Sequence, residues 1–141
     1  MLRTFSAAVC IAATVLVGTV ASAVAKVVAK IDLNDQEMQV YVDGRLRHTW
    51  PVATGRQGYE TPTGSYSAKR LEREWYSTKY DDAPMPNAVF FNGGYAVHGS
   101  GGRKGRPASH GCVRLDYGNA RAFFNLVASH GTGNTRIVVS D

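Results

Sequence analysis

Apolar and polar residues alternate along three stretches of the chain, 27–33, 38–43 and 45–54. A spacing of two residues is typical of a β-strand that buries one face. The residues that this spacing places on one face of the third stretch are Leu46, His48, Trp50 and Val52. Pro51 interrupts that stretch and indicates an edge position or a bulge, because proline cannot donate a ladder hydrogen bond. Asp43-Gly44, between the second and third stretches, predicts a tight hairpin turn.

The rest of the chain alternates short apolar stretches with polar loops. Further strands are predicted over residues 65–68, 88–91, 95–98 and 135–139. Three consecutive apolar residues in the last of them indicate burial on both faces. The stretch 54–64, with its glycines and proline, is predicted to be a loop. Residues 71–86 are predicted to form a long loop that partly covers a cleft, and a plain surface excursion is the alternative.

One amphipathic helix is predicted after Asp116, a residue type that often caps a helix N-terminus. Apolar residues recur on one face at helical spacing. They are Ala120, Phe123, Phe124, Val127 and Ala128. His130 lies in the predicted last turn, and Gly131 follows as the terminating residue. Together these elements predict a mostly-β fold, a β-sandwich or open barrel with one main α-helix.

The N-terminus has the features of a secretory signal peptide. A basic start is followed by a short apolar run, residues 7–20, and by small residues that precede a cleavage site after Ala23 or Ala25. We therefore expect a signal peptide over residues 1–25 and one folded domain over residues 26–141. The alternative is an uncleaved anchor. Because the run is short for a membrane span, no stable span is expected once the signal is removed.

The formal net charge of the chain is +5, which is mildly basic. Lys and Arg are interspersed with acidic residues except at Arg103-Lys104 and Arg106, and no long basic run indicates a nucleic-acid partner. A weak positive field suits an anionic partner such as a cell-wall polymer, and an ordinary solvated surface is the alternative.

The sequence contains two cysteines, of which Cys10 would leave with the signal peptide. Exported proteins in oxidising compartments usually pair their cysteines. The remaining thiol, Cys112, is therefore predicted to form an intermolecular bridge or to be reactive, with a buried inert thiol as the alternative. Gly111 directly before it and His110 two residues back favour a reactive thiol.

A cysteine needs a base or a neighbouring cation to react as the thiolate. His98, at the end of a predicted strand, and His110 are the two candidates. The backbone N–H groups of Gly111 and Cys112 are candidates for an oxyanion hole. Arg114 could bind a substrate carboxylate or brace the loop.

Zinc ligation is the rival hypothesis for His98, His110 and Cys112. No fourth ligand is evident, and the sequence has neither a Cys-x-x-Cys nor a His-x-x-x-His pair. We therefore expect no metal and no other cofactor. His48 and His130 are predicted to be structural, the first on a strand face and the second at a helix end, where a positive charge is favourable.

The stretch Ser109-His110-Gly111-Cys112-Val113-Arg114, with His98-Gly99-Ser100 upstream, resembles the signature of the L,D-transpeptidase catalytic domain family, also called the YkuD type. Thr54-Gly55 and Thr61-Pro62-Thr63-Gly64-Ser65-Tyr66 resemble a loop of the same family. The resemblance covers residues 26–141 and implies a β-sandwich-like catalytic domain that acts on peptidoglycan in the periplasm or cell envelope. The spacing from His98 to Cys112 is slightly shorter than is common in the family, which implies that residues 103–105 shape a different acceptor site.

The resemblance also implies a reaction. Cys112 would attack the carbonyl between the third, L-centred residue of a tetrapeptide stem and its terminal D-alanine. D-alanine would leave, and the acyl group would pass to an amine on another stem peptide or on a protein such as an outer-membrane protein. His98 would be the general base and acid, with its ring oriented by the Gly99 carbonyl. The residues implied at the oxyanion site or its backbone support are Ser109, His110, Gly111 and Cys112, and those implied at the substrate pocket are Tyr95, Ser100 and Arg114.

Two other functions fit the same residues. An acyl-enzyme that reacts with water would make the chain an L,D-carboxypeptidase or an amidase, and only the products separate these from a transpeptidase. A non-catalytic wall-binding module is the third hypothesis, although such a module has no need of a thiol, a histidine and glycine-flanked N–H groups together.

Overall fold

The computed structural model describes residues 13–19 and 24–141. Most of the predicted signal peptide, including Cys10, lies outside the described residues. Residues 13–19 form neither helix nor strand. Within the described ranges, no helix is both long enough and apolar enough to cross a membrane.

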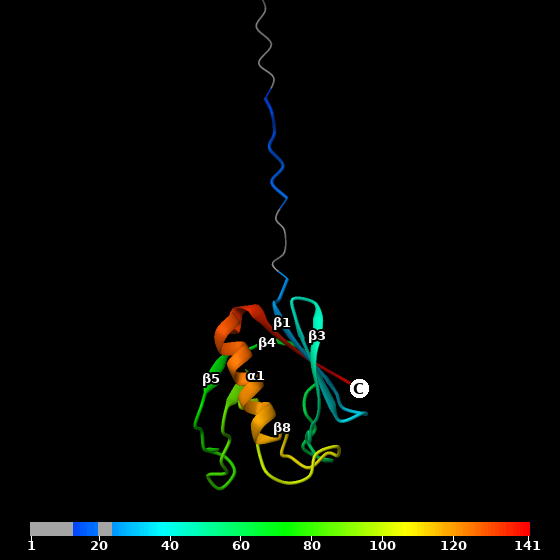
Figure 1. The fold of residues 1–141 in the computed structure, drawn as a ribbon, viewed down its shortest axis with the longest axis vertical. Helices are drawn as coiled ribbons and strands as arrows, with labels where there is room; N and C mark the ends of the chain where they lie inside the picture. Colours follow the sequence, from blue (N-terminus) through cyan, green and yellow to red (C-terminus); the bar gives the residue numbers. More distant parts are fainter. Residues whose placement is uncertain (1–12, 20–23) are drawn as a thin grey trace, which may run out of the picture.

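The folded part consists of two β-sheets and one main helix (Figure 1). A five-stranded sheet in the order β3-β2-β1-β9-β4 contains β1 (Val27–Asp32), β2 (Glu37–Val42), β3 (Arg45–Pro51), β4 (Gly64–Ser67) and β9 (Thr135–Ser140). A four-stranded sheet in the order β5-β6-β7-β8 contains β5 (Arg70–Glu72), β6 (Ala88–Asn92), β7 (Tyr95–Gly99) and β8 (Val113–Leu115). The helix is α1 (Tyr117–His130), followed by a 3-10 turn, η1 (Thr132–Asn134). The predicted mostly-β fold class with one main helix is confirmed.

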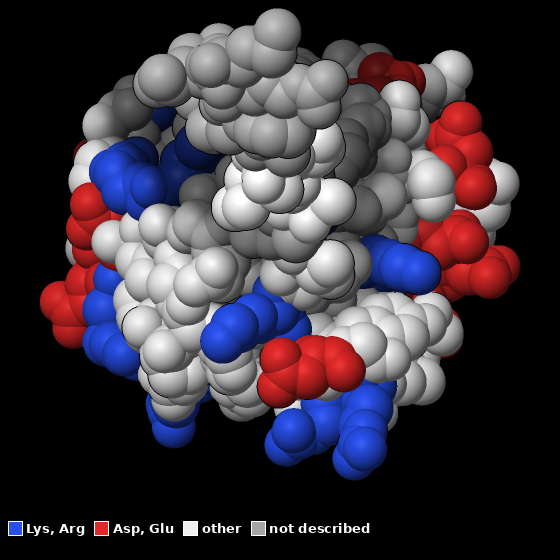
Figure 2. Space-filling view, turned by 90° about the horizontal axis from the view of Figure 1, so that it is seen from above, with Lys and Arg blue, Asp and Glu red and all other residues white. Residues whose placement is uncertain are grey.

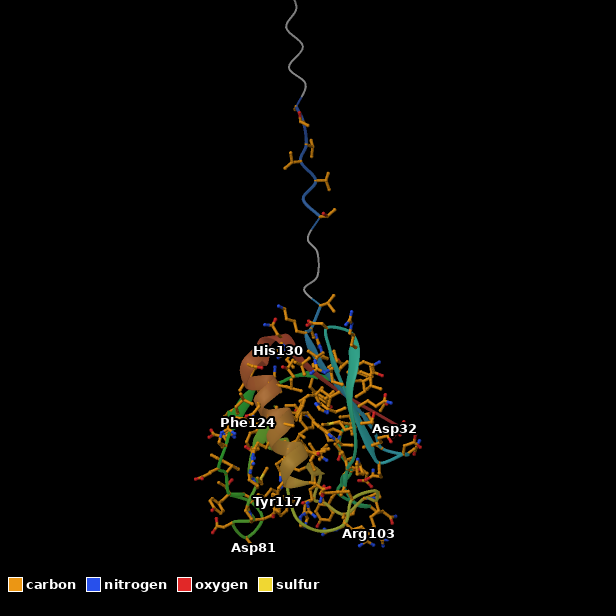
Figure 3. The ribbon with its side chains drawn as sticks, in the orientation of Figure 1. Asp32, Asp81, Arg103, Tyr117, Phe124 and His130 are labelled. Carbon is orange, nitrogen blue, oxygen red and sulfur yellow. The ribbon has the colours of Figure 1, made fainter. Side chains whose placement is uncertain are left out.

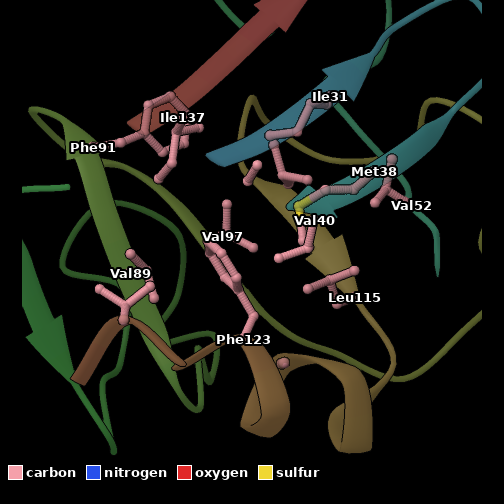
Figure 4. Packing of buried hydrophobic residues seen from close by; sticks show 14 of the residues in the cluster. Ile31, Met38, Val40, Val52, Val89, Phe91, Val97, Leu115, Phe123 and Ile137 are labelled. Atoms are coloured by element: carbon pink, nitrogen blue, oxygen red, sulfur yellow. The ribbon is translucent and has the colours of Figure 1, made fainter. Parts of the chain in front are cut away.

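The hydrophobic core is built from both sheets and α1 (Figure 4). The alternation in β1 and β2 buries every second side chain, as the sequence predicts. Large side chains that are fully buried in the core include Ile31, Met38, Phe91, Leu115, Phe123 and Ile137. Burial of one such side chain contributes about 1.5–3 kcal/mol, so the shared core fixes the two sheets and the helix against one another.

The prediction that Leu46 shares the buried face of β3 is wrong. Val40 of β2 lies opposite His48 and Tyr41 lies opposite Leu46, which leaves Arg47 as an extra residue in β3. Such a bulge reverses the alternation beyond it. Leu46 consequently lies on the outer face and is 51% exposed.

Several other features differ from the sequence-based expectation. β3 ends at Pro51 instead of residue 54 and lies at the edge of its sheet, as the proline indicates. β9 is central between β1 and β4 but buries only one face, with Val138 half-buried. Ala128 of α1 is exposed. The strands β5 and β8 are not predicted, because three residues are too few to show a period.

Long loops gather at one end of the sandwich (Figure 3). Asp81 in the loop 73–87, Arg103 in the loop 100–112 and Tyr117 at the start of α1 all lie at the end opposite His130. The chain enters β1 near the His130 end (Figure 1). Seen from that end, basic and acidic side chains both occur around the surface and neither sign covers it (Figure 2).

Candidate active site

Two parallel strands, β7 and β8, place the candidate catalytic residues. In their register His98 lies opposite Arg114. Cys112 directly precedes β8 in the chain. All three residues line one cavity of about 550 Å³. Parallel pairing therefore brings together a histidine and a cysteine from separate parts of the sequence.

His98 is a buried imidazole with one nitrogen fixed by the backbone. Its Nδ1 donates a hydrogen bond to the carbonyl oxygen of Gly99 at 2.8 Å, which leaves Nε2 as the nitrogen that can accept a proton. Burial lowers the pKa of His98 to about 4. The Gly99 hydrogen bond opposes this shift, and the charges of Arg114 and Lys104 reinforce it. Near neutral pH the ring is therefore an uncharged proton acceptor.

Cys112 is a half-buried free thiol. Its Sγ lies 3.8 Å from the carbonyl oxygen of Gly94 and donates to it. Burial raises the pKa of the Cys112 thiol, and the backbone N–H of Ala96 and the Arg114 guanidinium partly oppose that rise. The thiol consequently stays protonated near neutral pH and needs a base before it can attack.

Ser109 holds the backbone around Cys112. Its hydroxyl accepts from the Gly111 N–H at 2.9 Å and donates to the Cys112 carbonyl at 2.5 Å. The Gly111 N–H, one of the two expected oxyanion donors, is therefore already engaged, and the Cys112 N–H remains as the candidate. Gly111 has a φ of +124°, and a Cβ there would lie 2.5 Å from Cε1 of Tyr95, so only glycine fits.

A threonine from the predicted loop 54–64 connects to the same backbone. The buried Thr61 hydroxyl accepts from the Gly55 N–H at 2.9 Å and donates to the Gly111 carbonyl at 2.8 Å. A Cβ at Gly55 would overlap the carbonyl oxygen of Tyr59, which explains the glycine. The loop that resembles the family motif thus supports the backbone that carries the thiol.

Sequence reasoning missed Gln36, a buried residue behind this loop. Its Nε2 donates to the Leu33 carbonyl at 2.8 Å and to Thr54 Oγ1 at 2.6 Å, and its Oε1 accepts from the Thr54 N–H at 3.0 Å. The Thr54 carbonyl accepts from the N–H groups of Ala108 and Ser109. A single glutamine in a polar turn carries no sequence signal for such a role.

His110 lines the cavity, but its side chain has other partners. Its Nε2 accepts a hydrogen bond from Nη2 of Arg56 at 3.0 Å. The ring stacks on Tyr80 at a centroid distance of 4.2 Å and meets Tyr59 edge-on at 4.9 Å. Burial and the Arg56 charge lower the pKa of His110. Because Arg56 occupies Nε2, the geometry favours His98 over His110 as the base for Cys112.

The loop 73–87 forms part of the cavity wall, as expected of a loop over 71–86 that partly covers a cleft, although Leu71 and Glu72 belong to β5 instead. It is ordered as a hairpin, with the Met85 N–H donating to the Trp75 carbonyl at 2.7 Å and the Ser77 N–H donating to the Ala83 carbonyl at 2.9 Å. Its aromatic side chains in an otherwise polar stretch were the available sequence signal.

The other expected pocket residues also lie at the cavity. Tyr95 and Ser100 line it together with Arg114, whereas Gly99 and Ser109 are buried. Arg70 and Lys79 line it as well and were not predicted, because nothing in the sequence connects them to Cys112. Among the described residues, no Asp or Glu lines this cavity. The arrangement suits a ligand that carries negative charge.

Metal ligation was the rival hypothesis for the same histidines and cysteine. In the part of the chain that the structure describes, no group of three or more His, Cys, Asp or Glu side chains is arranged to hold a metal ion. His48 stacks on Trp50 at 4.4 Å, away from this site. The Nδ1 of His130 lies 2.9 Å from the Leu126 carbonyl in the last turn of α1.

Known proteins share this fold. The chain is similar to an L,D-transpeptidase from Stackebrandtia nassauensis, with 26% identity and a TM-score of 0.74 over 82% of this chain and 56% of that one. It is similar to an L,D-transpeptidase from Xylanimonas cellulosilytica, with 28% identity and a TM-score of 0.68 over 84% and 62% of the two chains. It is also similar to L,D-transpeptidase 3 from Mycobacterium tuberculosis in complex with a faropenem-derived adduct, with 23% identity and a TM-score of 0.70 over 82% and 60%.

The family model of the L,D-transpeptidase catalytic domain matches residues 26–139. No curated protein sequence matches the chain significantly. The chain spans less than two thirds of the length of each of the three solved proteins. Because the family match covers most of the chain, the chain belongs to the L,D-transpeptidase catalytic domain family, which acts on peptidoglycan in the cell envelope.

Proposed function

We propose that this member of the L,D-transpeptidase family is an exported cysteine transpeptidase that acts on the tetrapeptide stems of peptidoglycan through a thioester acyl-enzyme. The observation that carries the proposal is the cavity shared by the Cys112 thiol and the uncharged ring of His98. A protonated thiol beside a neutral imidazole is a nucleophile with its general base.

The first half-reaction forms the acyl-enzyme. Sγ of Cys112 attacks the carbonyl carbon that precedes the terminal D-alanine, while Nε2 of His98 takes the thiol proton. The tetrahedral intermediate then collapses with cleavage of the C–N bond, and His98 returns the proton to the amine of the leaving D-alanine. The product is a thioester on Cys112 and free D-alanine.

The second half-reaction transfers the acyl group. An acceptor amine attacks the thioester carbonyl and loses a proton to His98, and that proton returns to the Cys112 thiolate as the C–S bond breaks. The acceptor is an amine of a second stem, which gives an L,D crosslink, or an amine of an envelope protein such as an outer-membrane protein.

The remaining residues have supporting roles in this proposal. The Cys112 N–H stabilises the oxyanion, and the bonds from Ser109 and Thr61 hold the backbone that presents it. Arg114, with Arg70 and Lys79, binds the carboxylates of the stem peptide. Tyr95, Ser100 and His110 shape the walls, as their positions in the cavity support.

The experiment measures the mass of the intact protein after incubation with a tetrapeptide stem or with faropenem, a probe suggested by the relative solved with a faropenem-derived adduct. The wild type is expected to gain the acyl group, and Cys112→Ala is expected to gain none. Ser129→Ala, on α1 away from the cavity, is the control and should be acylated like the wild type. An adduct on the alanine variant would show that the nucleophile is wrong, and no adduct on the wild type would favour a wall-binding module.

Hydrolysis is the alternative fate of the same acyl-enzyme. Incubation with purified wall fragments distinguishes the two, because crosslinked dimers indicate a transpeptidase and trimmed stems without crosslinks indicate a carboxypeptidase. Release of a wall-attached protein would indicate an amidase.

Export is proposed from residues 1–25, which have the composition of a signal peptide. The family match begins at residue 26, which supports residues 26–141 as the catalytic domain. The N-terminal sequence of the protein recovered from the cell envelope tests this proposal. An N-terminus at Val24 or Lys26 is expected, and an intact Met1 would indicate an uncleaved anchor.

A further inference from the structure

Lys104 is a buried cation in the loop that follows His98. Its side chain is only 4% exposed, although lysine is almost never buried without partners. Its Nζ donates to the carbonyls of Gly102 at 2.9 Å and Ser100 at 3.1 Å, with the Gly101 carbonyl at 3.4 Å. The carboxylate of Asp116, at the N-cap of α1, lies 3.2 Å away. The three hydrogens of the ammonium are thus satisfied by the loop that it closes and by the start of the helix.

The loop held by Lys104 is continuous with the base. It begins directly after Gly99, whose carbonyl accepts the hydrogen bond from Nδ1 of His98. Ser100 and Gly101 line the cavity. A shift of this loop would therefore change both the cavity wall and the carbonyl that orients the imidazole.

We propose that Lys104 is a positioning residue for His98, because its ammonium holds residues 100–102, directly after β7, in one conformation and places a fixed positive charge near the imidazole. The proposal rests on the proposed function, since it assigns the loop a role only if His98 accepts the thiol proton. A buried methionine in place of Lys104 would leave the loop carbonyls without donors and would remove the charge.

The Lys104 ammonium is one of several charged or titratable groups around the His98 imidazole. The two cations that act on His98 are Lys104 and, from β8, Arg114, and both lower its pKa. Other titratable side chains also line the cavity, from two strands of the four-stranded sheet, the neighbouring loops and α1. They are Arg70 of β5, Lys79 and Tyr80 of the loop 73–87, Tyr95 of β7, His110 and Cys112 of the loop 100–112, and Tyr117 of α1. Asp116 offsets part of the Lys104 charge but is 60% exposed. Loss of Lys104 should therefore raise the pKa of His98.

The test compares Lys104→Met with Arg106→Met, which removes one charge from an exposed position in the same loop. The rate constant for acylation by faropenem is measured from pH 3.5 to 8, and the folded fraction is followed by circular dichroism. Lys104→Met is expected to lower the rate constant at pH 7 by roughly 10-fold or more, since small misplacements of catalytic groups have effects of this size. The acid limb of its pH–rate profile, where the acylation rate constant falls as His98 becomes protonated, should also move to higher pH by about 0.5 pH unit or more. Arg106→Met should match the wild type in both respects.

Two outcomes would overturn the proposal. In the first, Lys104→Met is folded and has the acylation rate constant and the acid limb of the wild type. In the second, its rate constant is lower only in proportion to the lost folded fraction, and the acid limb stays at the wild-type pH. If Lys104→Met does not fold, Lys104→Gln is measured in the same way. Its amide NH2 group can still donate to the loop carbonyls but carries no charge, so this variant must show the shifted acid limb. A wild type that forms no adduct would contradict the proposed function itself, whereas a normal wild type with unaffected Lys104 variants would contradict only the role of Lys104.

Discussion

Nδ1 of His98 donates a hydrogen bond to the carbonyl oxygen of Gly99, the next residue in the chain, at 2.8 Å. This bond fixes the tautomer and leaves Nε2 to accept a proton. It uses the backbone of the same strand end, so no carboxylate is needed to orient the ring. Burial, which lowers the pKa of His98 to about 4 against the effect of this bond, keeps the oriented imidazole uncharged near neutral pH.

Replacement of His98 tests this arrangement. His98→Ala is expected to slow acylation by about 100-fold or more, because a positioned general base contributes about that much. Rapid-mixing measurements of acyl-enzyme formation would show the change. His48→Ala is the control, since His48 stacks on Trp50 away from the cavity. An unchanged rate in His98→Ala would transfer the role of the base to His110.

The pH dependence of stability follows from the same histidine. Its pKa is about 4 in the folded protein against an ordinary value of 6.5. As the pH falls through 6.5 the unfolded chain binds a proton before the folded one, so stability decreases down to about pH 4 and this contribution is then constant. A difference of this size corresponds to about 3 kcal/mol. Urea unfolding of the wild type and of His98→Gln between pH 7 and 4 should show a smaller loss in the variant, and equal losses would contradict the assignment.

Gly111→Ala is expected to damage both stability and acylation. A residue with a side chain at φ +124° is strained, and the added Cβ would overlap the Tyr95 ring. Strain of this kind costs about 1–3 kcal/mol, and the displaced backbone carries the thiol. Gly118→Ala on α1 is the matched control, because no atom lies within 4 Å of a Cβ there, and it should be neutral or slightly stabilising. Thermal unfolding measures the loss of stability, and mass spectrometry measures adduct formation. A Gly111→Ala variant with the melting temperature and acylation rate of the wild type would contradict both expectations.

Thr61→Val should weaken the support of the nucleophile loop. The change keeps the side-chain shape but leaves the Gly55 N–H and the Gly111 carbonyl without their shared partner. Loss of a buried hydrogen bond costs about 1–3 kcal/mol, and we expect slower acylation with it. Thr61→Ser keeps the hydroxyl and should retain most of the stability and rate, as measured by urea unfolding and by mass spectrometry. If serine and valine behaved alike, the hydroxyl would have no such role.

Much of the fold follows from local pattern. The alternation in 27–33 and 38–43 predicts β1 and β2, and Asp43-Gly44 predicts the turn after them, because these signals depend on neighbouring residues only. The single-residue bulge at Arg47 leaves no such signal, so the outward position of Leu46 was missed. The three-residue strand β8 was missed for a similar reason.

The sequence by itself determined the alternating strands β1 and β2, the helix after Asp116, and the position of Cys112 close in sequence to glycines and histidines. Only the tertiary structure distinguished the two candidate bases for the Cys112 thiol. Nε2 of His110 is bonded to Arg56, whereas His98 is bonded to the Gly99 carbonyl through Nδ1 and lines the same cavity as Cys112. The tertiary structure also decided the burial of Lys104 and the bond from Thr61 to Gly111. The physical reason is that these contacts join groups far apart in the chain, which only the packing of the two sheets and their loops brings within hydrogen-bonding distance.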